Sequence, residues 1–246
     1  MFGIGVALEA GKLVRSIRSG SLVGAVEFKD DGSPVSKTEA KIEAMCRHRL
    51  QSFCCDAAMI GEETGGTLPA DGFAVAIDPI DGTWSLLNRS STCAVSLAVF
   101  RDAVPFCGIV LNPATGELAY GCSGHRTRLI QVSALGEADT ACDLPLDGSG
   151  ERTILVNLHP SKDAADVAKN LFQAWKSGEL SMLRMAGGSP AWALLEAAKG
   201  SSTYVNLWSR KPADAFDLAA GILLVQSAGG QVTDIAGRPI NPVGHV

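Results

Sequence analysis

The sequence is poor in several features that would indicate familiar classes of protein. Its 246 residues include only two tyrosines and four histidines. No apolar run is long enough to span a bilayer, and the apolar residues 2–8 lack the basic lead-in of a signal peptide. The formal net charge of −5 argues against a nucleic-acid-binding surface as the main function. We therefore expect a globular protein that binds neither nucleic acid nor membranes.

The seven cysteines also lack a recognisable pattern. They form no Cys-x-x-Cys pair, and no histidine lies at a spacing suited to zinc. Cys93 and Cys107 have apolar neighbours in the sequence, where a thiol is expected to act as a small hydrophobic side chain. The odd number of cysteines and the missing secretion signal predict a protein of the reducing cytoplasm.

What the sequence does contain is enough apolar material for a substantial core, with 46% hydrophobic residues. Helical periodicity predicts helices over residues 2–19, 39–53, 161–176, 191–199 and 216–228. Short apolar runs between turn residues predict strands near 23–28, 57–60, 73–77, 94–100, 106–111, 117–121, 153–157, 183–186, 203–207 and 231–233. The Gly-, Asp- and Ala-rich residues 134–150 indicate a seam between residues 1–134 and 135–246, within one compact unit.

The most informative stretch is Asp-Pro-Ile-Asp-Gly-Thr at residues 78–83, which follows the apolar run 73–77. Two carboxylates at the end of a buried strand are costly unless a partner such as a divalent cation compensates them. Because a proline fixes its own φ and lacks an N–H, we expect a sharp turn between Asp78 and Asp81. The Ile80 carbonyl could then act as a third hard oxygen ligand, which suits magnesium.

The end of the same motif predicts a phosphate site. Gly82 and Thr83 are expected at the start of a helix, where backbone N–H groups favour an anion. A strand-to-loop turn is the alternative interpretation, since Asp, Pro and Gly are common turn residues. The Asp-x-Asp-Gly-Thr motif of phosphatases with an aspartate nucleophile does not match, because two residues separate the aspartates here.

Acidic residues at three further positions also stand out. Glu62 lies beside Glu63 on a glycine-rich loop, which is a second suggestive feature and for which a solvated loop is the alternative. Asp217 lies near the start of a strongly apolar helix, where it could act as a helix N-cap. Glu39 lies in the first turn of another predicted helix, where a solvated acid would favour the helix N-terminus.

Taken together, these segments resemble the inositol monophosphatase family of magnesium-dependent, lithium-sensitive phosphatases. The resemblance covers nearly the whole chain, and the combination of Gly-Glu-Glu with the central hexapeptide is its most specific part. The matching elements are Lys29 with Ser33-Pro34-Val35, Gly61-Glu62-Glu63, residues 78–83, Gly188-Ser189, Asp217-Leu218-Ala219-Ala220-Gly221 and Ala228-Gly229-Gly230.

The resemblance implies a five-layered αβαβα sandwich with an N-terminal α+β half and a C-terminal α/β half. It implies two firmly bound Mg²⁺ ions and a third, weaker one beside Glu39, where the family has a shorter aspartate. The implied metal ligands are Glu62, Asp78, the Ile80 carbonyl, Asp81 and Asp217.

The expected function is hydrolysis of a small phosphate monoester by a metal-activated water, without a phosphoenzyme, most closely as in an inositol-1-monophosphatase. The expected catalytic residues are Glu62, Thr83 and Asp81, and the expected substrate contacts are Gly82, Thr83, Gly188, Ser189 and Asp217. A 3′-phosphoadenosine 5′-phosphate phosphatase and a fructose-1,6-bisphosphatase are alternatives from the same family. A non-catalytic, protein-binding relative is the alternative from another class. We also expect a homodimer.

Overall fold

Strand β4 (Phe73–Asp81) is buried along nearly its whole length, because almost all of its side chains are apolar. Alternate side chains of a strand point to opposite faces of a sheet. Val75 and Ile77 accordingly belong to one apolar cluster. Ala74 and Ala76 belong to the other. A strand of this kind requires helices on both faces of its sheet.

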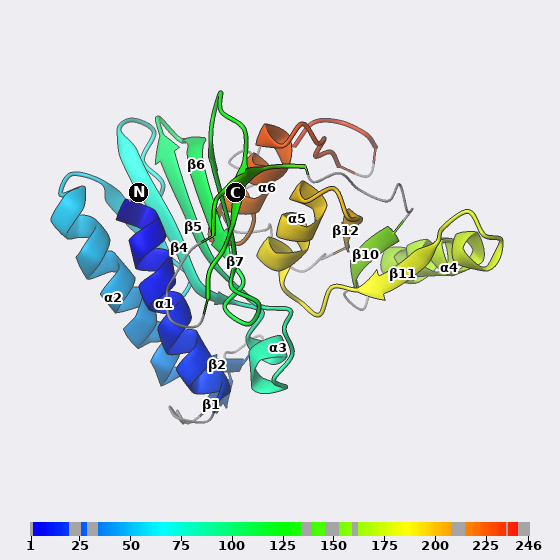
Figure 1. The fold of residues 1–246 in the computed structure, drawn as a ribbon, viewed down its shortest axis with the longest axis horizontal. Helices are drawn as coiled ribbons and strands as arrows, with labels where there is room; N and C mark the ends of the chain where they lie inside the picture. Colours follow the sequence, from blue (N-terminus) through cyan, green and yellow to red (C-terminus); the bar gives the residue numbers. More distant parts are fainter. Residues whose placement is uncertain are drawn as a thin grey trace.

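The computed structural model describes residues 2–19, 26–28, 34–133, 139–145, 153–158, 162–207, 215–234 and 236–240. Figure 1 shows the large sheet that contains β4, together with β5, β6 and β7. The strand order of the whole sheet is β3-β4-β5-β6-β7-β8-β9. Only β3 and β4 pair in parallel, and the other neighbours are antiparallel. The remaining strands are β3 (Ala58–Gly61), β5 (Ala94–Arg101), β6 (Val104–Leu111), β7 (Glu117–Cys122), β8 (Arg128–Gln131) and β9 (Cys142–Asp143).

Helices cover both faces of this sheet. On one face lie α1 (Phe2–Arg18) and α2 (Lys37–Phe53), and on the other lie α5 (Pro190–Ala198) and α6 (Ala215–Ser227). The short helix α3 (Thr83–Leu87) follows directly after β4. The approach of α6 to the sheet is close, because a Cβ at Gly108 would lie 2.7 Å from the backbone oxygen of Ala220.

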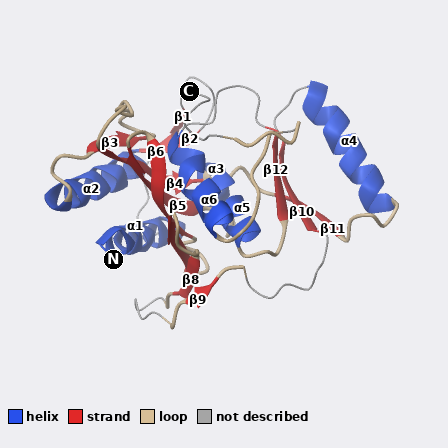
Figure 2. Cartoon of the chain, turned by 90° about the horizontal axis from the view of Figure 1, so that it is seen from above, coloured by secondary structure: helices blue, strands red, loops and turns tan. Residues whose placement is uncertain are grey.

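Beyond α5 lies a smaller sheet of parallel strands. Its order is β11-β10-β12, and α4 (Lys162–Lys176) packs on its outer side. Figure 2 shows the resulting succession of helix, sheet, helix, sheet and helix layers, which confirms the predicted αβαβα sandwich. The strands are β10 (Thr153–Leu158), β11 (Met182–Met185) and β12 (Thr203–Leu207), and a separate hairpin joins β1 (Val26–Phe28) to β2 (Pro34–Ser36).

Several local predictions were wrong. Strand β4 continues through Pro79 to Asp81, instead of ending at residue 77 with a sharp turn between Asp78 and Asp81. It does so by a register shift against β5 between Asp78 and Asp81, and a bulge is a place where a strand tolerates proline. Strands β8 and β9 were not predicted, and residues 231–233 form only an isolated bridge, between Thr233 and Pro239.

Cys107 also differs from its prediction as a small hydrophobic side chain. It pairs directly across β6 and β7 with Cys122, and the two form a disulfide. Cys93 is buried with a free thiol, as predicted, and burial raises its pKa to about 12. Within the described ranges, no helix combines the length and apolar character that crossing a membrane requires. The division at residues 134 and 135 stays a prediction.

Candidate active site

The two aspartates of the central motif lie at the bulge near the end of β4, where both are buried. Asp78 is 1% exposed, and its Oδ1 accepts a hydrogen bond of 2.9 Å from the backbone N–H of Ile80. Asp81 is 5% exposed, and its Oδ2 accepts hydrogen bonds from Ser189 Oγ at 2.7 Å and from Ala191 N at 2.6 Å. The motif is therefore joined to the first turn of α5.

The start of α5 is shaped to meet this motif. Ser189 is the N-cap of α5, because its Oγ accepts from Trp192 N while it donates to Asp81. Gly82 has a φ of 92°, and a Cβ at this position would lie 2.8 Å from Ser189 Cβ. A side chain at Gly82 would therefore force the two loops apart. Among the predicted substrate contacts, the structure brings Gly82 and Ser189 together, with Gly188 preceding the cap.

Helix α2 supplies the partner of the last residue in the motif. Thr83 Oγ1 donates a hydrogen bond of 2.9 Å to Glu39 Oε1, and a longer contact of 3.5 Å joins it to the Ile80 carbonyl. Glu39 is 2% exposed, so the alternative of a solvated acid at a helix N-terminus is wrong. Glu39 lies beside the predicted metal motif, as the resemblance implied.

Glu62 lies on a small closed loop between β3 and β4. Backbone hydrogen bonds join Gly61 and Gly65 in both directions, and Glu62 N donates to the Ile77 carbonyl of β4. Glu62 is half-buried, whereas residues 64–67 of the same loop are exposed. The remaining acid, Asp217, lies within the first turn of α6, which begins at Ala215. Asp217 is therefore inside the helix and not at its N-cap.

The sequence analysis missed two residues that support this loop. Glu43 is fully buried on α2, and its carboxylate accepts hydrogen bonds from the backbone N–H of Glu63 and the hydroxyl of Thr64. It also forms an ion pair of 2.9 Å with Arg47. The spacing of Glu39, Glu43 and Arg47 was the available signal, since residues four apart share one face of a helix.

The charges at this site repel one another. Burial raises the pKa of Asp78 well above its usual value, and the negative charges of Glu62, Asp81 and Asp217 raise it further. Burial likewise raises the pKa of Asp81 to about 7, although the hydrogen bonds from Ser189 and Ala191 oppose the increase. In the part of the chain that the structure describes, no lysine or arginine forms an ion pair with either aspartate.

This donor set fits a hard divalent cation. Buried carboxylates that raise one another's pKa lack a compensating positive charge, and carboxylate and carbonyl oxygens are the ligands that Mg²⁺ prefers. No group of three acidic, histidine or cysteine side chains within the described ranges is already arranged to hold a metal.

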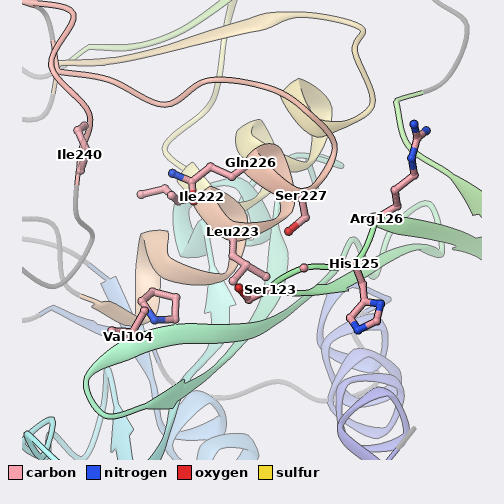
Figure 3. A pocket seen from close by; sticks show the side chains of 11 residues that line it. Val104, Ser123, His125, Arg126, Ile222, Leu223, Gln226, Ser227 and Ile240 are labelled. Atoms are coloured by element: carbon pink, nitrogen blue, oxygen red, sulfur yellow. The ribbon is translucent and has the colours of Figure 1, made fainter.

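A separate cavity of about 700 Å³ lies at the other end of α6 (Figure 3). It is lined by the β6 start, the segment after β7 and the C-terminal half of α6, whereas Asp217 lies in the first turn of that helix. In Figure 3 the side chains of His125 and Arg126 point away from Gln226. None of the predicted site residues lines this cavity, so it is not the site described above.

Comparisons with known proteins agree with this geometry. The sequence model of the inositol monophosphatase family matches residues 2–245. The inositol-1-monophosphatase of Rhizobium meliloti is 29% identical over 86% of this chain and 76% of its own length. The histidinol-phosphatase of Mycobacterium tuberculosis is 23% identical over 96% and 87%. The structure of a Thermotoga maritima IMPase is 23% identical, with a TM-score of 0.77 over 98% and 87% of the two chains.

Proposed function

The chain belongs to the inositol monophosphatase family, which confirms the predicted class of phosphoric monoester hydrolase, and we propose that it is a Mg²⁺-dependent, inositol-1-monophosphatase-like enzyme. The observation that carries this proposal is the hydrogen bond from Thr83 to the buried Glu39, directly after the two buried aspartates. A hydroxyl that donates a hydrogen bond to a carboxylate can pass its proton to that carboxylate. Such a pair beside a cluster of metal-binding acids is suited to deprotonating a water.

Two metal ions are expected at the carboxylate cluster, and a third, weaker one beside Glu39. When bound, divalent cations lower the pKa of a coordinated water and neutralise charge on phosphate oxygens. The cluster is composed of hard oxygen donors, which supports magnesium. The residues proposed to hold the metals are Glu62, Asp78, the Ile80 carbonyl, Asp81 and Asp217.

Thr83 and Glu39 are proposed to move the proton of the attacking water. A hydroxyl that donates its own hydrogen still has lone pairs that accept another. Thr83 Oγ1 would accept a proton from the water as its own proton passes to Glu39 Oε1, which leaves hydroxide to attack phosphorus and a neutral Thr83 hydroxyl. Glu62 would orient the same water from the opposite loop. This general-base step requires no covalent bond between phosphorus and the protein.

The substrate phosphate is proposed to lie against the start of α3. The first N–H groups of a helix have no intrahelical acceptor, and they favour an anion. Gly82 and Thr83 occupy these positions at α3. Ser189, which caps α5 and donates to Asp81, and the preceding Gly188 are proposed to contact the remainder of the substrate together with Asp217.

Relatives with different substrates in their names supply further candidates for the alcohol that is released from the phosphate ester. Relatives named histidinol-phosphatase and fructose-1,6-bisphosphatase/inositol-1-monophosphatase match at similar identities, so histidinol phosphate and fructose 1,6-bisphosphate are the second candidates. A 3′-phosphoadenosine 5′-phosphate phosphatase is the third. All predicted metal-binding acids are present, which disfavours a non-catalytic relative. The homodimer and the cytoplasmic location stay predictions.

Phosphate release across a substrate panel tests the proposal. The panel contains inositol 1-phosphate, histidinol phosphate, fructose 1,6-bisphosphate and 3′-phosphoadenosine 5′-phosphate, each with magnesium and after chelation and desalting. We expect release with magnesium, fastest from inositol 1-phosphate, and none without a divalent cation. Full activity in the chelated protein, or no release from any ester, would contradict the proposal.

A further inference from the structure

We infer that Glu43 is a positioning residue of the active site, because its buried carboxylate holds the loop that carries Glu62. The inference rests on the proposed function, in which Glu62 binds metal and orients the water. Glu43 is not a member of the carboxylate cluster, and it acts on Glu62 through the two residues that follow it, by hydrogen bonds from the Glu63 backbone N–H and the Thr64 hydroxyl.

The contacts of Glu43 lie immediately after Glu62. Its Oε2 accepts a hydrogen bond of 2.8 Å from the backbone N–H of Glu63, and its Oε1 accepts the hydroxyl of Thr64. The same carboxylate also lies under the residue before Glu62, since a Cβ at Gly61 would be 2.1 Å from Glu43 Oε1. One side chain therefore contacts the loop on both sides of the proposed ligand.

Arg47 compensates the buried negative charge of Glu43. Its Nε donates to Glu43 Oε1 at 2.9 Å, which neutralises the carboxylate inside the protein. Its two terminal nitrogens donate to the carbonyls of Met59 at 3.1 Å and Gly65 at 2.8 Å. The guanidinium of Arg47 thus contacts the chain on both sides of the loop, at Met59 in β3 and at Gly65.

Glu43 and Glu39 both lie on α2. Glu39, which pairs with Thr83, lies one helical turn earlier on the same helix. A single helix therefore positions both residues that are proposed to act on the attacking water, Thr83 and Glu62. Hydrogen-bonded groups behind metal ligands typically change metal affinity 10- to 100-fold when they are removed.

The test compares Glu43→Gln with Glu117→Gln in the full chain. Glutamine keeps the volume of Glu43 but loses its charge. Glu117 is a matched control, because it is also a largely buried glutamate in an ion pair, with Lys199 at 2.6 Å, between β7 and α5. The measurements are calorimetric Mg²⁺ binding to the metal-free protein, hydrogen exchange of the 61–65 amides, and kcat and KM against magnesium.

For Glu43→Gln we expect Mg²⁺ affinity to fall about tenfold, the half-saturating magnesium concentration to rise in parallel, and the Glu63 amide to exchange faster. KM for the substrate at saturating magnesium should change little. Glu117→Gln should leave all of these values as in the wild type. Thr64→Val removes one donor to Glu43 and keeps the ion pair with Arg47. It should lower Mg²⁺ affinity and speed amide exchange in the loop by smaller amounts. This variant replaces Glu43→Gln as the test if Glu43→Gln does not fold.

The results separate this inference from the proposed function. Unchanged Mg²⁺ binding and loop exchange in the Glu43 and Thr64 variants would overturn the positioning role, even where the wild type hydrolyses its substrate. A wild type that binds Mg²⁺ but hydrolyses no phosphate monoester would overturn the proposed function, whereas weaker Mg²⁺ binding by Glu43→Gln would still support the role of Glu43 in the loop. A wild type that binds no Mg²⁺ would overturn both.

Discussion

The hydroxyl of Thr83 donates a hydrogen bond of 2.9 Å to the carboxylate of Glu39, although 44 positions separate them in the chain. Glu39 belongs to α2, on one face of the large sheet, whereas Thr83 begins α3 after the last residue of β4. Because the carboxylate is buried, the hydroxyl has a fixed acceptor for its proton. Its oxygen can still accept a hydrogen bond from a water.

Removal of this hydroxyl should slow catalysis much more than it weakens the fold. We expect Thr83→Ala to lower kcat by on the order of 10²- to 10⁴-fold, as for a lost proton-transfer group, and Thr83→Ser to retain most of it. Thr115→Ala is the matched control, since Thr115 also donates to a glutamate, Glu117, at 2.9 Å on an exposed turn. Equal kcat in Thr83→Ala and Thr115→Ala would contradict the proposed role of Thr83.

Replacement of Asp81 by asparagine should abolish turnover without unfolding the protein. The amide oxygen can still accept from Ser189 and Ala191, while one of the repelling charges is lost. We expect Tm of the metal-free protein to rise by roughly 2–4 °C for each kcal/mol of repulsion relieved. Calorimetry with chelator and an activity assay with magnesium measure both effects. Asp139→Asn, at an exposed position, is the control, and retained kcat in Asp81→Asn would refute the assignment of Asp81 as a ligand.

Glu39 should affect both proton transfer and the weak third metal. The carboxylate of aspartate is one methylene shorter, which leaves room for the waters that Mg²⁺ keeps. We expect Glu39→Asp to shift magnesium saturation to lower concentration and Glu39→Gln to shift it higher, with kcat lowest in Glu39→Gln. Magnesium titrations of the three proteins measure the shifts. Superimposable curves would mean that Glu39 has no part in the third metal site.

Gly61 should tolerate no side chain. A Cβ there would lie 2.1 Å from the fully buried carboxylate of Glu43, which hydrogen bonds from Arg47, Glu63 and Thr64 hold in place. We expect Gly61→Ala to destabilise the protein by about 1–3 kcal/mol through overpacking and to weaken magnesium binding. Gly5→Ala is the control within α1, where nothing lies within 4 Å of the added methyl group, and it should be stabilising by about 0.5–1 kcal/mol. Denaturant unfolding of both variants distinguishes them, and equal stability would contradict the close contact at Gly61.

Much of the layered fold could be predicted from local pattern. The apolar periodicity of residues 2–19 and 39–53 anticipated α1 and α2, and the apolar run 73–77 anticipated most of β4. Such periodicity can be recognised in a sequence because each helix or strand must turn one face toward the core. The hexapeptide 78–83 could also be recognised as a candidate metal site, since two acids after a buried strand are costly without a partner.

The contacts of the site were decided by the tertiary structure. The pairs Thr83 with Glu39, and Asp81 with Ser189, join residues that are 44 and 108 positions apart. No local pattern specifies such a pairing, because it depends on how α2 and α5 pack against opposite faces of one sheet.

The same reason explains the errors. The disulfide between Cys107 and Cys122 follows from the register of β6 and β7, which sequence spacing does not reveal. The passage of β4 through Pro79 depends on a bulge against β5. The sequence by itself therefore determined which acids are available for the chemistry, and the packing of helices on the sheet decided which partners orient them.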